Sequence, residues 1–303
     1  MTRTGLLYEN ATARHLAVLR MWVFGMWLGD LLKDPVSDLA AIPLAYYQPV
    51  GVLRWFPPGF WEAALSPPLL QIWWGGLALL LVLSVAGVPF YRGVALAACV
   101  LLTFYQGAVF GFTSVTHGPI AALHIAWLLA LFPSADALSL RRGPGFAKSD
   151  NVYKAAILTA TILFLATYML VGVRRVIEGG TEIFLDGSIL RFLARNSISP
   201  SQLPQRLGLT VLEVPGLPMM FQVGFVLVTF FEITSLLCVA SKWFRRTWLA
   251  VMIPFHVLSW PLLQLLFLHN ILLIAVLLVD LEGITGRIIP GRWLGAPARR
   301  QAV

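Results

Sequence analysis

The feature that most constrains this chain is the near-continuous succession of apolar stretches along its 303 residues. Only 12% of the residues are charged, whereas soluble domains carry about 25%. Because so few charges cannot cover the surface of a water-soluble fold, much of the surface is expected to face lipid. No polar block is long enough to form a second, water-soluble core. The sequence therefore predicts one membrane domain over residues 1–303.

Eight stretches have the length and composition of membrane spans, since a helix needs about 20 apolar residues to cross about 30 Å of hydrocarbon. They run approximately over His15–Leu32, Leu69–Pro89, Val94–Thr113, His117–Phe132, Ala155–Val173, Leu217–Ala240, Trp248–Leu263 and Leu265–Leu281. The short links between the third and fourth and between the seventh and eighth predict antiparallel hairpins. Whether both hairpins reach fully across stays open. The expected fold is an all-α, polytopic bundle of about eight transmembrane helices.

The basic residues predict the orientation, because Lys and Arg concentrate in cytoplasmic loops. With the N-terminus inside, the inner segments hold 14 of the 22 basic residues, including a basic cytoplasmic tail over 283–303. Both termini are therefore expected in the cytoplasm. The net charge of +8 is explained by topology and by attraction to anionic membrane lipids, without a nucleic-acid partner. The first apolar run contains Arg20 and Asp30 and lacks a cleavage site after it, so it is expected to remain as a span.

Two segments on the predicted outer side are too long to be simple turns. Residues 33–66 mix Pro, Trp, Tyr and Phe, which favours pieces lying at the level of the lipid headgroups. Residues 180–216 contain a short amphipathic pattern over Ile189–Arg195. We expect both segments to be interfacial and to form a lid over the outer face.

Charged and polar side chains inside predicted spans ask for a partner, because one charge costs about 2.5 to 3.5 kcal/mol there. The predicted topology gathers several of them near the outer face: Asp30, His117, Arg174, Arg175, His256 and His269. Glu232 lies near the middle of the sixth span and Arg20 lies within the first. This convergence on one side is a stronger indication of a site than any single residue.

Each of these residues also has a structural interpretation, which the sequence leaves open. Arg174 and Glu178 have the spacing of a helical ion pair. His117 is placed to cap the fourth span, and His256 to bind a carbonyl freed by Pro254. Glu232 is expected to be protonated or paired with an internal arginine such as Arg20, and Arg20, Asp30 and Glu232 are interpreted as structural charges in the membrane.

Several chemistries have no support in the sequence. The histidines lie on separate predicted helices without HExxH or a carboxylate one turn away, so no metal site is predicted. GxSxG, Walker A and GxGxxG motifs are absent. Cys99 and Cys238 lie in apolar runs and are interpreted as small buried residues.

Five short motifs occur in order along almost the whole chain: Val18-Leu19-Arg20, Thr116-His117-Gly118 with Phe132–Leu140 behind it, Tyr168–Arg175 with Phe184-Leu185-Asp186-Gly187, Phe231-Glu232, and Phe255-His256-Val257. Together they resemble the membrane region of vitamin K-dependent γ-carboxylase and the horizontally transferred transmembrane domain (HTTM) proteins. The resemblance implies a pocket on the non-cytoplasmic side for a quinone, in which His117 and His256 match pocket histidines. Arg175 occupies the position of the lysine that acts as base in the carboxylase. Arginine stays protonated in proteins, which argues against γ-glutamyl carboxylation here.

Taken together, these observations lead to a bacterial inner-membrane, multi-pass protein with an outward-facing pocket for a menaquinone- or ubiquinone-type quinone or another lipid. The predicted catalytic residues are His117, His256 and Arg175, and the predicted lipid- or substrate-binding residues are Arg174, Tyr168, Trp260 and His269. Whether the protein is a diverged quinone-dependent enzyme stays open. The alternative is a non-enzymatic membrane partner in the maturation or export of a peptide, with the aromatic outer segments holding the peptide or partner protein.

Overall fold

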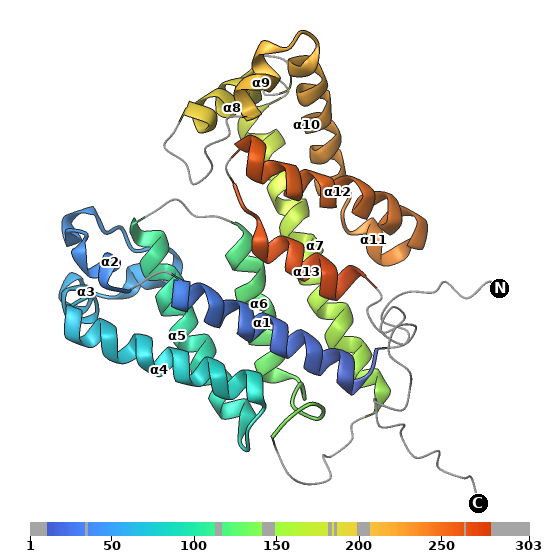
Figure 1. Ribbon diagram of the computed structural model, residues 1–303. Coiled ribbons are helices and arrows are strands. Elements are labelled where there is room, and N and C mark those ends of the chain that lie inside the picture. The colour runs from blue at the N-terminus through green and yellow to red at the C-terminus, as the bar shows by residue number, and fades with distance from the viewer. Residues whose placement is uncertain are drawn as a thin grey trace, which may run out of the picture.

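The protein, seen here as a computed structural model, is all-helical in the part of the chain that the structure describes: residues 11–33, 36–112, 117–140, 149–180, 184, 187–198, 207–263 and 265–279. Figure 1 shows the arrangement of its helices. In the N-terminal half they are α1 (Ala13–Lys33), α2 (Val36–Ala41), η2 (Leu44–Tyr46), η3 (Gly51–Trp55), α3 (Pro58–Ala64), α4 (Pro67–Ala86), α5 (Tyr91–Phe112) and α6 (His117–Leu131). In the C-terminal half they are α7 (Asp150–Gly179), α8 (Ser188–Ile198), α9 (Leu207–Glu213), α10 (Leu217–Ile233), α11 (Leu237–Ala240), α12 (Lys242–Leu263) and α13 (Leu268–Leu278).

Four helices within the described residues, α1, α4, α5 and α7, are long and apolar enough to cross a membrane. A fifth span results if α9 and α10, which meet at an angle of 113°, are taken together. These helices fit a helical membrane protein. The predicted count of eight is not confirmed, and both termini lie outside the described residues, as does the predicted tail over 283–303.

Four of the eight predicted spans do not form, within the described residues, single helices that are long and apolar enough to cross a membrane, and the structure shows why. The sixth is interrupted after Ile233, so that α11 has only 4 residues. The helix at the predicted seventh span begins earlier, at Lys242, and its first turns carry several basic residues. The helices α6 and α13 are short, with 15 and 11 residues. Their lengths of about 22 Å and about 17 Å are less than the hydrocarbon thickness of a bilayer.

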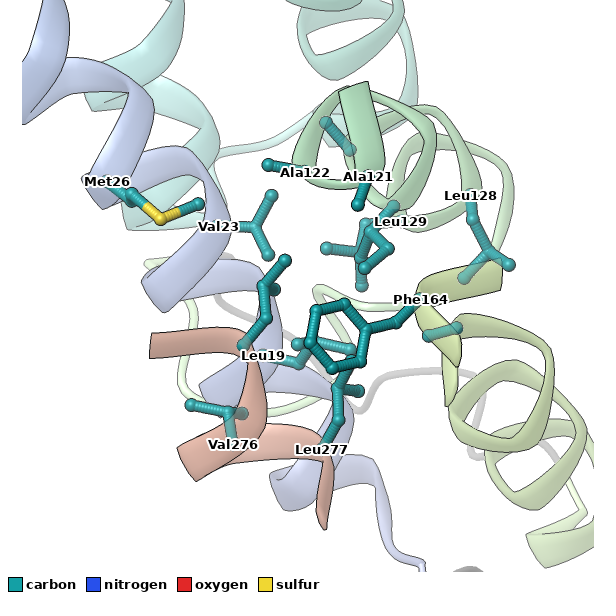
Figure 2. Packing of buried hydrophobic residues seen from close by; sticks show 14 of the residues in the cluster. Leu19, Val23, Met26, Ala121, Ala122, Leu128, Leu129, Phe164, Val276 and Leu277 are labelled. Carbon is teal, nitrogen blue, oxygen red and sulfur yellow. The ribbon is translucent and has the colours of Figure 1, made fainter. Parts of the chain in front are cut away.

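The core lies where α1, α6, α7 and α13 meet. Figure 2 shows Leu19 and Val23 of α1 facing Leu129 of α6, Phe164 of α7 and Leu277 of α13. All five side chains are buried. α4 and α5 pack beside this group. α10 packs against the C-terminal part of α7, α12 contacts α7 through Tyr168, and α8 and α9 lie beyond α10 and α12 (Figure 1). The long helix α7 therefore joins the two halves of the molecule.

Arg20 ties the ends of two helices together inside the first half. It is fully buried, and its guanidinium donates hydrogen bonds to the carbonyls of Val85, Ser134, Ala137 and Leu138. Val85 lies in the last turn of α4, where backbone acceptors lack helical partners, and the other three carbonyls lie in the turns and bends that follow α6. The side chain thus satisfies groups that would otherwise be unpaired.

The turn after α4 fits around this guanidinium. Gly87 ends the helix in the left-handed conformation, with φ of 63°. A Cβ atom at this position would lie 2.7 Å from Arg20 Nη1. Both the backbone conformation and the close approach therefore require glycine.

The predicted interfacial segments are helical where described. Residues 36–64 form short helical pieces against α4 and α5, and their aromatic side chains pack around Trp61. The amphipathic pattern over Ile189–Arg195 lies within α8, whose Ile189 and Leu193 point inward while Arg191 and Arg195 are more exposed.

Candidate functional site

A buried polar network joins α7, α12 and α13. The Tyr168 hydroxyl shares a hydrogen bond of 2.6 Å with Nε2 of His256 and also bonds the side chain of Asn270. All three residues are at most 2% exposed. The Trp248 ring of α12 packs edge-on against the Tyr168 ring, with ring centres 5.2 Å apart. Buried polar groups without partners are costly, so this mutual pairing fixes three helices relative to one another.

Arg175 lies two turns beyond Tyr168, about 10 Å further along α7. Its Nη1 donates to Glu232 at 2.5 Å and to the Thr229 hydroxyl at 2.8 Å, and its Nη2 donates to the second Glu232 oxygen at 3.3 Å. Its guanidinium carbon lies 4.7 Å from the centre of the Phe225 ring, within range of a cation–π contact. The side chain of Arg175 is 19% exposed and that of Glu232 only 3%.

The approach of α7 to α10 depends on Gly172. A Cβ atom at this position would lie 2.9 Å from both Cβ of Glu232 and the backbone nitrogen of Ile233. Only the missing side chain lets the two helices come this close. The ion pair between Arg175 and Glu232 forms less than one turn further along α7.

An apolar cavity of about 630 Å³ opens beside this ion pair. Its walls come from α8, α9, α10, α12 and the start of the segment that follows α12, and they consist almost entirely of aliphatic and aromatic side chains. Arg175 contributes the charge and Ser259 a hydroxyl. The volume is within the range of about 300 to 1,000 Å³ found for small-molecule pockets. The cavity therefore has largely apolar walls, with one charged side chain among the described residues that line it.

His256 lies behind the cavity wall and does not line it. The rings of Phe255 and Phe267 line the cavity, and their centres lie 5.1 Å and 5.2 Å from that of the imidazole. The imidazole is 1% exposed and is held by Tyr168. It is therefore placed to position Tyr168 and these two rings, and a ligand in the cavity would meet the aromatic rings first.

The Asp30 carboxylate at the end of α1 contacts Nε2 of His269 at the start of α13. The His269 ring also packs against Trp27, with ring centres 5.6 Å apart. At the other end of these helices, His15 Nε2 lies 3.3 Å from the Val276 carbonyl, so α1 and α13 run antiparallel. His269 thus positions α13, and with it Asn270, and it does not line the cavity.

The structure distributes the remaining predicted site residues differently from the expectation. Arg174 pairs with Glu178 at 2.6 Å on the exposed side of α7, which confirms the helical ion pair and directs this cation away from the cavity. Trp260 is 42% exposed and does not line the cavity.

His117 is the first residue of α6, and its side chain lies outside the described residues. The neighbouring Gly118 abuts the Asn270 side chain, which places the start of α6 beside the buried network.

Glu232 is paired with an arginine, which was one of the two expectations, but this arginine is not Arg20, the example suggested by the sequence. Arg175 is the arginine that meets Glu232, whereas Arg20 is enclosed by backbone carbonyls in the other half of the molecule. The partner could not be predicted from separation along the chain, because both arginines are far from Glu232 in the sequence.

Sequence reasoning named Glu232 of α10 only as a structural charge, and it missed Phe225 and Thr229 on the same helix. Phe225, Thr229 and Glu232 recur at intervals of four and three, the spacing of one helical face. This face carries a hydroxyl and a carboxylate in a mostly apolar helix, and this pattern could have predicted a polar contact with another helix. Asn270 was visible only as a polar residue next to His269.

No protein-family model, curated protein sequence or solved structure matches this chain. What can be stated from the fold is the class: an all-helical protein with several helices that could span a membrane. Within the described residues, no cluster of three or more His, Cys, Asp or Glu side chains could hold a metal ion.

Proposed function

We propose that this protein binds a quinone or another lipid amphiphile in the cavity between α8, α9, α10 and α12, with the polar head of the ligand at Arg175. The observation that carries the proposal is the single guanidinium among the described residues that line a largely apolar cavity. Apolar cavities with a few placed polar groups are typical small-molecule sites. An amphiphile matches both parts at once.

The proposal agrees with the resemblance of the sequence to the membrane region of vitamin K-dependent γ-carboxylase and HTTM proteins. We propose a distant relationship to that group, and a location in the bacterial inner membrane with both termini in the cytoplasm. Fractionation of inner and outer membranes tests the location. Separate assays of γ-glutamyl carboxylation are expected to be negative, because Arg175 replaces the lysine and an arginine cannot serve as a base in a protein.

Gly224 offers a direct test, since it lines the cavity and a Cβ atom added there meets nothing within 4 Å. A leucine at this position would occupy the cavity without a clash at Cβ, and leucine favours a helix over glycine. Gly75→Leu on α4 is the matched control, because Gly75 also has open space around it and is remote from the cavity.

The measurement is mass spectrometry of lipids extracted from protein purified in mild detergent. Wild type and Gly75→Leu are expected to retain a stoichiometric quinone or other amphiphile, and Gly224→Leu to retain about tenfold less. Equal retention in the two variants would contradict the proposal. The alternative, a non-enzymatic partner for a peptide, predicts instead a stable copurifying protein or peptide and no bound lipid.

A further inference from the structure

We propose that the cavity selects uncharged amphiphiles with a hydrogen-bond acceptor at the head, and that Glu232 determines this selectivity. The inference rests on the proposed function, because it specifies which amphiphiles the same cavity accepts. A cavity with this selectivity would exclude fatty acids and anionic phospholipid heads, which an isolated arginine would attract.

The first step concerns charge. Among the described residues that line the cavity, Arg175 is the charged one. Glu232 already neutralises this charge, because its two carboxylate oxygens lie 2.5 Å and 3.3 Å from the guanidinium nitrogens. The carboxylate is 3% exposed, so water screens it little. An anionic head brought to Arg175 would meet this carboxylate as well as the cation. It would lose its hydration without finding an unpaired positive charge, which makes its binding unfavourable.

The second step concerns hydrogen-bond donors. An arginine has five N–H donors, and the contacts with Thr229 and Glu232 use three of them. Nε–H and one N–H of Nη2 have no acceptor among the described residues. They are suited to the lone pairs of a ketone, quinone or ester oxygen.

The hydroxyl groups of Thr229, beside Arg175, and of Ser259, in the cavity wall, add no further donor. Thr229 Oγ1 donates to the Phe225 carbonyl at 2.9 Å, and Ser259 Oγ donates to the Phe255 carbonyl at 2.7 Å. Their hydrogens are therefore committed within their own helices. Arg175 therefore recognises the head of the ligand. The head must carry a hydrogen-bond acceptor, and because Glu232 lies beside Arg175, it must carry no negative charge.

The experiment uses two probes with the same tail, methyl dodecanoate and dodecanoate, at a pH at which dodecanoate is ionised. Binding to the full-length protein in detergent is measured by native mass spectrometry over a range of probe concentrations. Wild type is expected to bind the ester about tenfold or more tightly than the anion. Glu232→Gln, which keeps the shape of the side chain but leaves Arg175 unneutralised, is expected to shift the preference about tenfold or more toward the anion.

Glu178→Gln is the matched control, because it removes the same charge from the neighbouring exposed ion pair with Arg174. It is expected to keep the wild-type preference. Equal binding of the two probes by wild type, or an unchanged preference in folded Glu232→Gln, would overturn the inference and leave the proposed function standing. Failure of wild type to bind either probe would overturn both. The wild-type comparison needs no substitution, so it decides the matter even if Glu232→Gln does not fold.

Discussion

At the scale of single residues, Arg20 and Arg175 have their donors satisfied in different ways. Arg20 is surrounded by neutral carbonyl oxygens at the end of α4 and in the segment that follows α6, whereas Arg175 is paired with a carboxylate. The planar guanidinium suits both settings, since it offers five donors over a wide fork. A lysine offers three donors from one point and would leave several of these acceptors unpaired.

The Arg175–Glu232 pair predicts a non-additive pattern of stability. Arg175→Met or Glu232→Met alone leaves one buried charge without its partner and should lower the free energy of unfolding by about 3 to 5 kcal/mol. The double variant removes both charges and should recover most of that loss. Thermal unfolding of the four proteins in one detergent measures the coupling. Additive losses in the double variant would show that the pair does not act as a unit.

At the scale of elements, the cavity exists because α9 and α10 do not continue in one direction. The two helices meet at an angle of 113°. Gly216 adopts φ of 86° immediately before α10, a conformation that favours glycine. The bend carries α9 and α8 over the end of α10 and α12 (Figure 1). Together these helices enclose the apolar space that a straight span would leave to lipid.

The crossing of α7 and α10 at Gly172 should be sensitive to one methyl group. Gly172→Ala places a Cβ atom 2.9 Å from the α10 backbone. This crowding should lower the free energy of unfolding by about 1 to 3 kcal/mol. Gly25→Ala in α1, where nothing lies within 4 Å, should leave it unchanged or slightly raised. Thermal unfolding compares the two. A Gly172→Ala protein as stable as Gly25→Ala would show that the helices can separate without penalty.

Helical class and the approximate positions of most helices follow from the sequence, because long apolar runs in α1, α4, α5 and α7 leave no other stable arrangement in lipid. The break after Ile233 does not follow, since the hydropathy of residues 217–240 is continuous and the turn depends on tertiary contacts such as that of Ser235 with the Leu165 carbonyl. The choice of Arg175 over Arg20 as partner of Glu232 likewise depends on which helices cross, and the decisive Gly172 carries no chemical signal of its own.

At the scale of the whole molecule, α7 connects two regions with different roles. Toward its N-terminal end it packs into the core with α1, α6 and α13, and toward its C-terminal end it carries Tyr168 and Arg175 to α10 and α12 (Figure 1). Many large apolar side chains, such as Leu79 of α4 and Met219 of α10, are exposed on the surface, as expected for contact with acyl chains. The first region contains most of the helices that are long and apolar enough to cross a membrane, and the second region contains the cavity.

Photolabelling tests the central claim most directly, namely that an amphiphile occupies the cavity with its head at Arg175. A quinone analogue with a photoreactive tail would be bound to the full-length protein, irradiated, and its adducts mapped by peptide mass spectrometry. We predict adducts on cavity-lining residues of α10 and α12, such as Phe221 and Leu258, which disappear in Gly224→Leu and persist in Gly75→Leu. Adducts confined to outward-facing residues of α4, or labelling of α10 and α12 unaffected by Gly224→Leu, would contradict it.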